Sequence, residues 1–196
     1  MARLVTTTGV PGRTIALTFD DGPNPPDTTR LLDTLGEHGV TAVFCLLGDQ
    51  VRRHPEVLER IVADGHVLGN HSMSHEDLED WSAGQVRDHI ESVNAVITDV
   101  VPGARIPFFR APYGHWGRSV QVAAELGMCP LSWSVVVDDW LEPGSDVLVD
   151  RLTGCIEPGD VVLLHDGGGD RSGTVDATSR VVVDYIAKGW RFVTPA

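Results

Sequence analysis

Short apolar runs rich in β-branched residues alternate along the chain with longer segments of helical period, and this alternation most narrows the folds that the chain can adopt. Seven runs are predicted to be strands, at residues 14–19, 41–46, 66–69, 108–110, 131–135, 161–165 and 192–194. Six segments are predicted to be helices, at residues 28–38, 55–64, 82–100, 118–126, 145–156 and 175–188. Because strands that alternate with helices form a parallel sheet with crossover helices, the sequence predicts an α/β fold.

The ends of several predicted helices carry residues that suit those positions. Pro55 fits a first helical position, where a missing N–H is tolerated, and Ser82 fits an N-cap. Gly39, Gly65 and Gly189 stand where a left-handed residue closes a helix. These signals support the helices independently of the hydrophobic period.

The length and composition are those of one globular domain. The 196 residues are 42% hydrophobic and 22% charged, so we expect a single domain over residues 1–196 with a sizeable core. The net charge of -13 argues against a nucleic-acid backbone or an anionic membrane surface as partner, since both bind clustered Lys and Arg. A neutral or cationic substrate is easier to accommodate, and no obligate protein partner is indicated.

Features of exported and disulfide-linked proteins are weak in this sequence. No apolar stretch is long enough to span a bilayer, and the first residues lack the apolar centre of a signal peptide. We expect a cytoplasmic protein if the chain is complete, and a secreted or cell-wall protein if an export signal has been removed. Cys45, Cys129 and Cys155 are widely spaced and odd in number, so they predict no disulfide framework, although one disulfide is left open.

Residues capable of catalysis end or follow five of the predicted strands. These segments are Asp20-Asp21, His71, Arg110, Asp138-Asp139-Trp140 and His165-Asp166. In a β/α fold the carboxyl ends of the strands and the loops after them form the active face. Chance placement would distribute such residues over both ends of the sheet, so their coincidence favours a catalytic site at one rim.

Asp20, Asp21, His71 and His75 together suit a metal ion. The adjacent carboxylates repel each other and favour a bound cation, and the histidines are spaced i, i+4, which on a helical turn places both imidazoles on one face. One carboxylate and two imidazoles leave a coordination position open, as in catalytic zinc sites, although Mn, Fe, Co and Ni suit the same ligands. The residues alone also allow a simpler interpretation, in which the aspartates form an exposed turn and the histidines are solvated.

His165 and Arg110 are candidates for proton transfer and charge stabilisation. A histidine that ends an apolar strand is often a hydrogen-bonded core residue, but its pKa near neutrality suits a general acid that Asp139 or Asp166 could orient. Arg110 is either a surface cation or the group that holds Asp20 ionised.

Most other ring side chains have structural interpretations. We expect three tryptophans to lie in the core: Trp116, Trp133 and Trp140. One or two of them near the rim could stack on a sugar ring. Structural or surface roles are assigned to His38, His54, His66, His89 and His115. His115 is the one to watch, because it lies beside the segment that begins at Arg110.

Five segments of the chain, in this order, resemble the motifs of the polysaccharide deacetylase family, also called the NodB homology domain or carbohydrate esterase family 4. They are Thr18-Phe19-Asp20-Asp21-Gly22-Pro23, His71-Ser72-Met73-Ser74-His75, Arg110-Ala111-Pro112-Tyr113-Gly114, Asp138-Asp139-Trp140 and Leu163-Leu164-His165-Asp166. The resemblance extends from Thr14 to Thr194 and implies a distorted (β/α) barrel of about seven parallel strands, with one divalent metal ion in its groove.

The resemblance also implies the roles of individual residues. Asp21, His71 and His75 match the metal ligands, with zinc as the first expectation and Co, Ni, Mn or Fe as alternatives. Asp20 matches the general base that activates water, and His165 matches the general acid that protonates the leaving group.

Further matches concern the partners and walls of the implied site. Arg110 is implied to pair with the general base, and Asp139 with the general acid. The backbone N–H of Tyr113 is implied to stabilise the oxyanion, and Trp140 and Leu163 to wall the pocket that takes the acetyl methyl group.

One position departs from the family pattern. The fourth motif usually begins with an aspartate where this chain has Val136, while the aspartate before Trp140 is retained as Asp139. This puts the polar support of that loop in question and leaves the partner of the histidine in place. Asp138 is a candidate to compensate.

Three functional hypotheses follow. The first is a metal-dependent hydrolase that removes N-acetyl or O-acetyl groups from a glycan such as chitin oligomers, peptidoglycan or acetylxylan. The second is a deacetylase or deformylase of a small amide or amino sugar inside the cell. The third is an inactive carbohydrate-binding relative. The presence of both the metal ligands and the proton-transfer residues argues against it.

Overall fold

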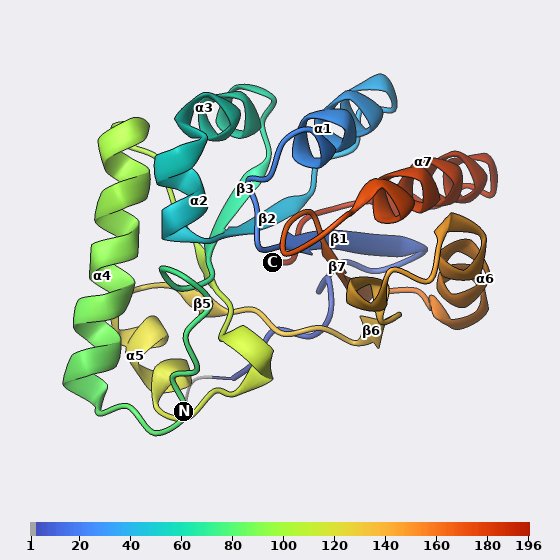
Figure 1. Cartoon of the computed structure of the whole chain (residues 1–196). Coiled ribbons are helices and arrows are strands. Elements are labelled where there is room, and N and C mark those ends of the chain that lie inside the picture. Colours follow the sequence, from blue (N-terminus) through green and yellow to red (C-terminus); the bar gives the residue numbers. More distant parts are fainter. Residues whose placement is uncertain (1–2) are drawn as a thin grey trace.

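The computed structural model describes residues 3–196, which form one sheet surrounded by helices (Figure 1). The strands of this described part are β1 (Thr14–Asp20), β2 (Val43–Leu46), β3 (Val67–Asn70), β4 (Phe108–Phe109), β5 (Cys129–Pro130), β6 (Val135–Val136), β7 (Asp160–His165) and β8 (Arg191–Phe192). The helices are α1 (Asp27–Glu37), α2 (Gly48–Arg53), α3 (Pro55–Ala63), α4 (Ala83–Val100), α5 (Ser119–Glu125), α6 (Ser145–Cys155) and α7 (Ser172–Ala187), with short 3-10 turns η1 (Pro112–Gly114) and η2 (Asp139–Leu141). The predicted α/β class is confirmed.

The sheet is parallel. It is also curled, because its two edge strands, β5 and β6, follow each other in the sequence. The strand order is β5-β4-β3-β2-β1-β7-β6, with β8 paired to β1. In a flat sheet, six spacings of about 4.8 Å would separate the outer strands by roughly 29 Å. The link from Pro130 to Val135 can span at most about 18 Å. The sheet therefore curls into an incomplete barrel, in agreement with the distorted barrel that the family resemblance implies.

The predicted strand at residues 131–135 is wrong, because this apolar run changes partners. β5 ends at Pro130 on one edge of the sheet, and β6 begins at Val135 on the other edge. Between them, the N–H of Leu131 donates to the Phe109 carbonyl at 2.8 Å, whereas the N–H of Ser134 donates to the Val161 carbonyl at 3.0 Å. Both ends of the run are buried, so its composition gives no sign of the crossing.

The six predicted helices are present, with ends shifted by at most three residues. Pro55 begins α3, Ser82 caps α4 in a reciprocal pair with Gln85, and the three predicted closing glycines have positive φ angles. Helix α2 is not predicted by the sequence. This helix has only six residues and buries only Gly48 and Val51, so it lacks a clear apolar period.

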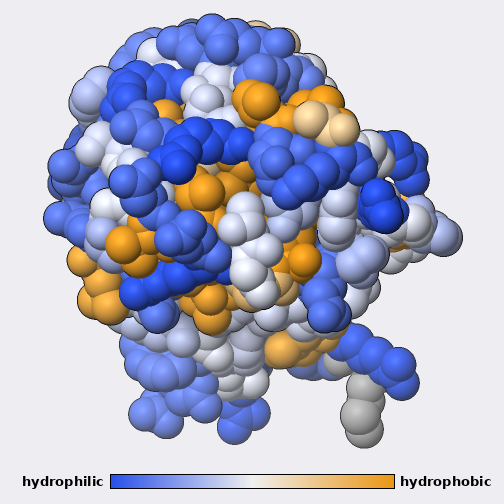
Figure 2. Space-filling model, turned by 90° about the vertical axis from the view of Figure 1, so that its right-hand side faces the viewer, coloured by the Kyte–Doolittle hydropathy of each residue, from blue (hydrophilic) through white to orange (hydrophobic). Residues whose placement is uncertain are grey.

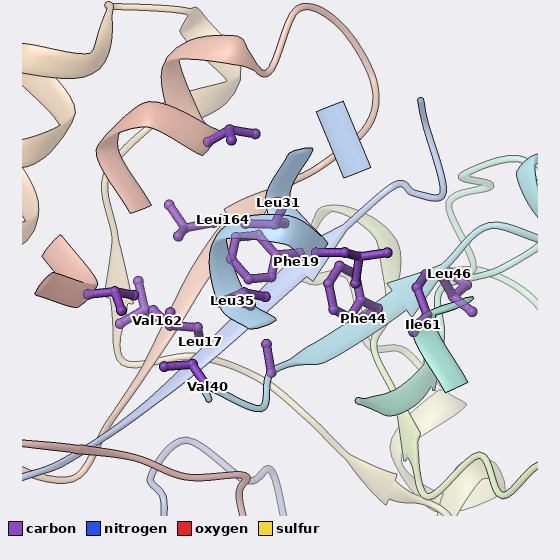
Figure 3. Close-up of a cluster of buried hydrophobic side chains, with 14 of the residues drawn as sticks. Leu17, Phe19, Leu31, Leu35, Val40, Phe44, Leu46, Ile61, Val162 and Leu164 are labelled. Atoms are coloured by element: carbon purple, nitrogen blue, oxygen red, sulfur yellow. The ribbon is translucent and has the colours of Figure 1, made fainter. Parts of the chain in front are cut away.

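Alternation along the strands separates the two faces of the sheet. Ile15, Leu17 and Phe19 pack in the large cluster beneath the outer helices, together with Phe44, Leu46, Val162 and Leu164 (Figure 3). The residues between them face the barrel interior, where Ala16, Val43, Cys45 and Val161 form a smaller cluster. Because side chains alternate along a strand, Asp20 at the end of β1 and His165 at the end of β7 also face the interior.

The face of the molecule on which α6 and α7 lie is mainly hydrophilic (Figure 2). Figure 2 shows the side on which α6 and α7 lie, with apolar side chains in several separate patches, and Val147, Val183 and Ile186 are exposed on these helices. Among the described residues, no helix is both long and apolar enough to cross a membrane. The three cysteines are free thiols, and Cys45 is buried as a small core residue, so the disulfide left open by the sequence does not form in this structure.

Candidate active site and metal centre

The predicted site residues meet in one cavity at the carboxyl ends of the strands. This cavity has a volume of about 550 Å³. Eight of the ten predicted residues line it: Asp20, Asp21, His71, His75, Tyr113, Trp140, Leu163 and His165. The other two, Arg110 and Asp139, are buried behind it as hydrogen-bond partners of Asp20 and His165. The predicted convergence at one rim is therefore present.

Asp21, His71 and His75 form a compact group of ligand atoms. The Oδ1 atom of Asp21 lies 3.5 Å from Nε2 of His71 and 3.6 Å from Nε2 of His75. Ligands held at about 2.0–2.2 Å around a tetrahedral ion lie roughly 3.3–3.6 Å from one another. These separations therefore match the spacing that a small divalent cation requires.

The hydrogen bonding of this group also suits a cation. Nδ1 of His71 lies 2.8 Å from the Arg110 carbonyl and must donate to it, so Nε2 of neutral His71 carries a lone pair. Oδ1 of Asp21 is buried and has no hydrogen-bond partner. Acceptors that face one another without a donor repel, and a shared cation removes that repulsion.

The two histidines lie on a loop, so the expectation that a helical turn aligns them is wrong. β3 ends at Asn70, and Ser72 and His75 have positive φ angles of 76° and 67°, which reverse the chain. The first two N–H groups of α2 hold this loop, because they donate to the carbonyls of Ser72 and Met73 at 3.1 and 2.9 Å. Helix α2 thus supports the loop that carries both histidines.

Asp20 and Arg110 form a buried ion pair. Nη1 of Arg110 donates to Oδ1 of Asp20 at 2.6 Å, and the other guanidinium nitrogens donate to the carbonyls of Leu131 and Ser132. Burial alone would raise the pKa of Asp20, but the charge of Arg110 and the nearby histidines outweigh it and hold the pKa below its usual value. Asp20 is therefore an ionised carboxylate.

His165 and Asp139 form a second pair on the other side of the cavity. Asp139 Oδ1 accepts from Nδ1 of His165 at 2.8 Å, and Oδ2 accepts from the backbone N–H of His165 at 2.8 Å. Burial would lower the pKa of His165, but the hydrogen bond and charge of Asp139, with the charges of Asp20 and Asp21, raise it above its usual value. The Nε2 atom is left to exchange a proton in the cavity.

Asp166 is not the partner of His165, which decides between the two alternatives left by the sequence. Its Oδ2 accepts from the hydroxyl of Thr28 at 2.6 Å, and the carboxyl group is fully buried. Burial raises the pKa of Asp166 to about 7.

Aromatic and aliphatic side chains form the walls of the cavity. The ring of Tyr113 lies 4.4 Å from that of His75, and the ring of Trp140 lies 5.5 Å from that of His165. Tyr113 adopts a left-handed conformation with φ of 60°. Leu163 is buried on the inward face of β7, two residues before His165.

Several residues of the site carry no clear signal in the sequence. Trp133 lines the cavity and lies over the Arg110 guanidinium at 5.8 Å, whereas Trp116 packs in a core cluster. Arg171 lines the cavity as a buried cation, although it follows a polar glycine-rich segment that reads as an ordinary loop. Glycines 167–169 were a usable signal, since three together indicate a close approach of backbone.

The structure also places four side chains near the histidine loop and the fourth motif. His89 accepts from the backbone N–H of Met73 at 3.2 Å, and His115 lies 2.8 Å from Asp77. Val136 is 43% exposed on β6. Asp138 lies 3.9 Å from Arg151 and outside the residues that line the cavity, so the structure gives no support for compensation by Asp138.

Comparisons with known proteins agree with this geometry. A family model described as polysaccharide deacetylase matches residues 7–131. The chitooligosaccharide deacetylase of Bradyrhizobium sp. (strain ANU 289) is 41% identical over 188 residues, which cover 94% of this chain and 84% of that protein. The crystal structure of the Bc1960 peptidoglycan N-acetylglucosamine deacetylase superposes with a TM-score of 0.90 at 34% identity, covering 96% of this chain and 89% of that chain.

A further solved relative is a mutant of BA3943, a CE4 family pseudoenzyme of Bacillus anthracis, with restored enzymatic activity. It superposes with a TM-score of 0.84 at 29% identity, covering 92% of this chain and 65% of that chain. The family model ends before Asp139 and His165, but the longer alignments cover more than nine tenths of the chain. By sequence and by fold, the chain belongs to the polysaccharide deacetylase family of hydrolases.

Proposed function

We propose that this protein hydrolyses N-acetyl groups of a glycan built from N-acetylglucosamine, with one divalent cation held by Asp21, His71 and His75. One observation carries the proposal: the three ligand atoms lie in the same cavity as an ionised aspartate and a histidine of raised pKa. Relatives that act on chitooligosaccharides and peptidoglycan support this substrate class.

The reaction requires three chemical contributions. An amide carbonyl is a poor electrophile and an amine is a poor leaving group, so hydrolysis needs a Lewis acid, an activated water and a proton donor. A divalent cation at the three ligands would polarise the acyl oxygen and lower the pKa of water in the site.

The side chains of the protein supply the proton transfers. Asp20, kept ionised by Arg110, accepts a proton from the attacking water. His165, whose protonated form Asp139 stabilises, donates a proton from Nε2 to the leaving amine. The two residues are register partners on adjacent strands, so both can reach one bound amide.

We assign the acetyl group to the space between Asp20 and His165. We assign the backbone N–H of Tyr113 to the developing oxyanion and the side chains of Trp140 and Leu163 to the acetyl methyl group. The rings of Trp140 and Tyr113 lie at the edge of the cavity, where these residues are 41% and 62% exposed. Such rings can stack on sugars on either side of the scissile bond.

We propose zinc as the metal. One carboxylate and two imidazoles form the donor set of hydrolytic zinc sites, and the same donors accept Co, Ni, Mn or Fe. Metal analysis of the purified protein, and reconstitution of the chelated protein with each ion, test this assignment. Highest activity with an ion other than zinc would contradict it.

A substrate panel separates the proposed function from its alternatives. Acetate release is measured with chitooligosaccharides, peptidoglycan fragments, acetylxylan and small N-acetyl sugars. We expect turnover of N-acetylglucosamine oligomers. Fast turnover of one monomeric amide with inert polymers would favour the small-molecule alternative, and turnover of acetylxylan alone would favour an O-deacetylase.

The alternative of an inactive relative is suggested by BA3943 and is tested by substitutions. Asp20→Asn and His165→Ala are expected to abolish turnover and retain the metal, whereas His71→Ala is expected to lose the metal. His54→Ala, at a histidine outside the cavity, is the control. Turnover retained in Asp20→Asn contradicts the assigned base, and binding of oligomers without any turnover by the wild-type protein supports the inactive relative.

A further inference from the structure

The loop after β7 contains three consecutive glycines that leave no room for side chains. A Cβ atom on Gly167 would lie 2.2 Å from the Asp21 carbonyl, one on Gly168 would lie 2.9 Å from Asp21 Oδ2, and one on Gly169 would lie 2.7 Å from Glu142 Oε1. Glycine permits this close approach to Asp21. Glycine also loses more backbone freedom on folding than any other residue, so the loop depends on external contacts to stay ordered.

Arg171 supplies contacts of this kind. Its side chain is almost fully buried, and Nε and Nη2 donate to the carbonyls of Gly167 and Gly168 at 2.7 and 3.0 Å. Nη1 donates to the Asp139 carbonyl at 3.2 Å. One planar guanidinium therefore joins the glycine loop, which borders Asp21, to the turn that carries Asp139.

The contacts of Arg171 depend on its shape more than on its charge. The nearest carboxylate oxygen is that of Glu142, 3.9 Å from Nη1 on a half-exposed side chain. The three hydrogen bonds go to neutral carbonyls in different directions. Lysine carries the same charge, but a single ammonium at the end of a flexible chain cannot reproduce this planar fork.

The first turn of α7 holds Asp139 at a second point. The hydroxyl of Thr174 donates to Asp139 Oδ2 at 3.0 Å, beside the bond from His165. Arg171 thus fixes the backbone of Asp139, and Thr174 fixes its carboxylate. The backbone N–H of Arg171 donates to buried Asp27 at 2.9 Å, which attaches this turn to α1.

We propose that Arg171 is a positioning residue for the reaction, which keeps the glycine loop beside Asp21 and the His165–Asp139 pair in a fixed relation. The proposal rests on the proposed function, in which these two sides of the cavity act on one amide. Arg171 itself need not touch the substrate. A misplacement of about 1 Å at a reacting group can lower a rate by roughly 100-fold, so a loosened loop is expected to affect turnover.

Steady-state kinetics of Arg171→Lys and Arg171→Ala test the proposal, with Arg180→Lys on the exposed side of α7 as the control. We expect kcat to fall by about 10- to 100-fold in both variants, with KM and zinc affinity changed by less than about threefold. Added guanidinium ion is expected to restore part of the activity of Arg171→Ala. A kcat of Arg171→Lys within about twofold of wild type, at equal stability, would overturn the role of the guanidinium shape.

Hydrogen–deuterium exchange provides a measurement that does not depend on activity. In Arg171→Lys we expect faster exchange in residues 166–170 and 138–142, with α4 unchanged. Unchanged exchange in these segments overturns the proposal. The wild-type protein could prove inert on every acetylated substrate while Arg171→Lys still speeds exchange in both segments. In that case the proposed function fails, but the role of Arg171 in holding the two segments together is supported.

Thr174→Val keeps the proposal testable if the Arg171 variants do not fold. This change removes the hydroxyl that holds the Asp139 carboxylate and conserves the side-chain shape. We expect kcat to fall by about 3- to 10-fold with unchanged KM. An unchanged kcat overturns the proposal.

Discussion

The buried pair of Arg110 and Asp20 is expected to show strong energetic coupling in a double-mutant cycle. Arg110 is fully buried and Asp20 is 3% exposed, with 2.6 Å between Nη1 and Oδ1. Arg110→Met leaves a buried carboxylate without its partner, which costs about 3–5 kcal/mol. It also removes donors from two carbonyls, but the double variant loses the same donors, so this contribution cancels. We therefore expect a coupling energy of about 2–4 kcal/mol.

Urea unfolding of the chelated protein at pH 7 measures this coupling without a contribution from metal binding. The four proteins are the wild type, Arg110→Met, Asp20→Asn and the double variant. The pair of Arg60 and Asp33 is a matched control, because its N–O distance is also 2.6 Å but its side chains are 36% and 59% exposed. Exposed pairs of this kind couple by about 0.2–1 kcal/mol. Coupling of Arg110 and Asp20 no larger than this would refute the reasoning.

Three further predictions follow from the same structure. Asp139→Asn is expected to shift the alkaline limb of the kcat/KM profile to lower pH, because the charge of Asp139, which raises the pKa of His165, is then lost, and the protonated form of His165 is needed. An unmoved limb would contradict the assigned acid. Chelation is expected to lower the thermal midpoint and zinc to restore it, with about 2.7 kcal/mol of stabilisation at 100 times the Kd, and a midpoint insensitive to both would argue against the metal centre. Gly22→Ala is expected to destabilise the fold by about 1–3 kcal/mol, since its Cβ would lie 2.1 Å from Asp166 Oδ2, while Gly36→Ala, with open space around it in α1, is expected to be neutral or stabilising.

The sequence predicted the residues of the site better than their local geometry. The strand ends at Asp20, Arg110 and His165 could be located because apolar runs stop there and polar residues follow. The loop conformation of His71 and His75 could not be predicted from their i, i+4 spacing. That spacing is compatible with a helical turn or a reversed loop. The N–H groups of α2, which lie more than twenty residues earlier in the chain, decide between them.

Alternation along the chain was enough to determine the fold class and the six longer helices, because the period of apolar residues is a local property. Alternate side chains of a strand point to opposite faces, so the sequence also shows which residues of a strand share a face. Only the tertiary structure decided that residues 131–134 cross between the sheet edges and that Arg171 joins the two sides of the cavity, and it placed Asp139 beside His165 as the family resemblance implies. Each of these outcomes depends on contacts between segments distant in the chain, and such contacts leave no periodic trace in the sequence.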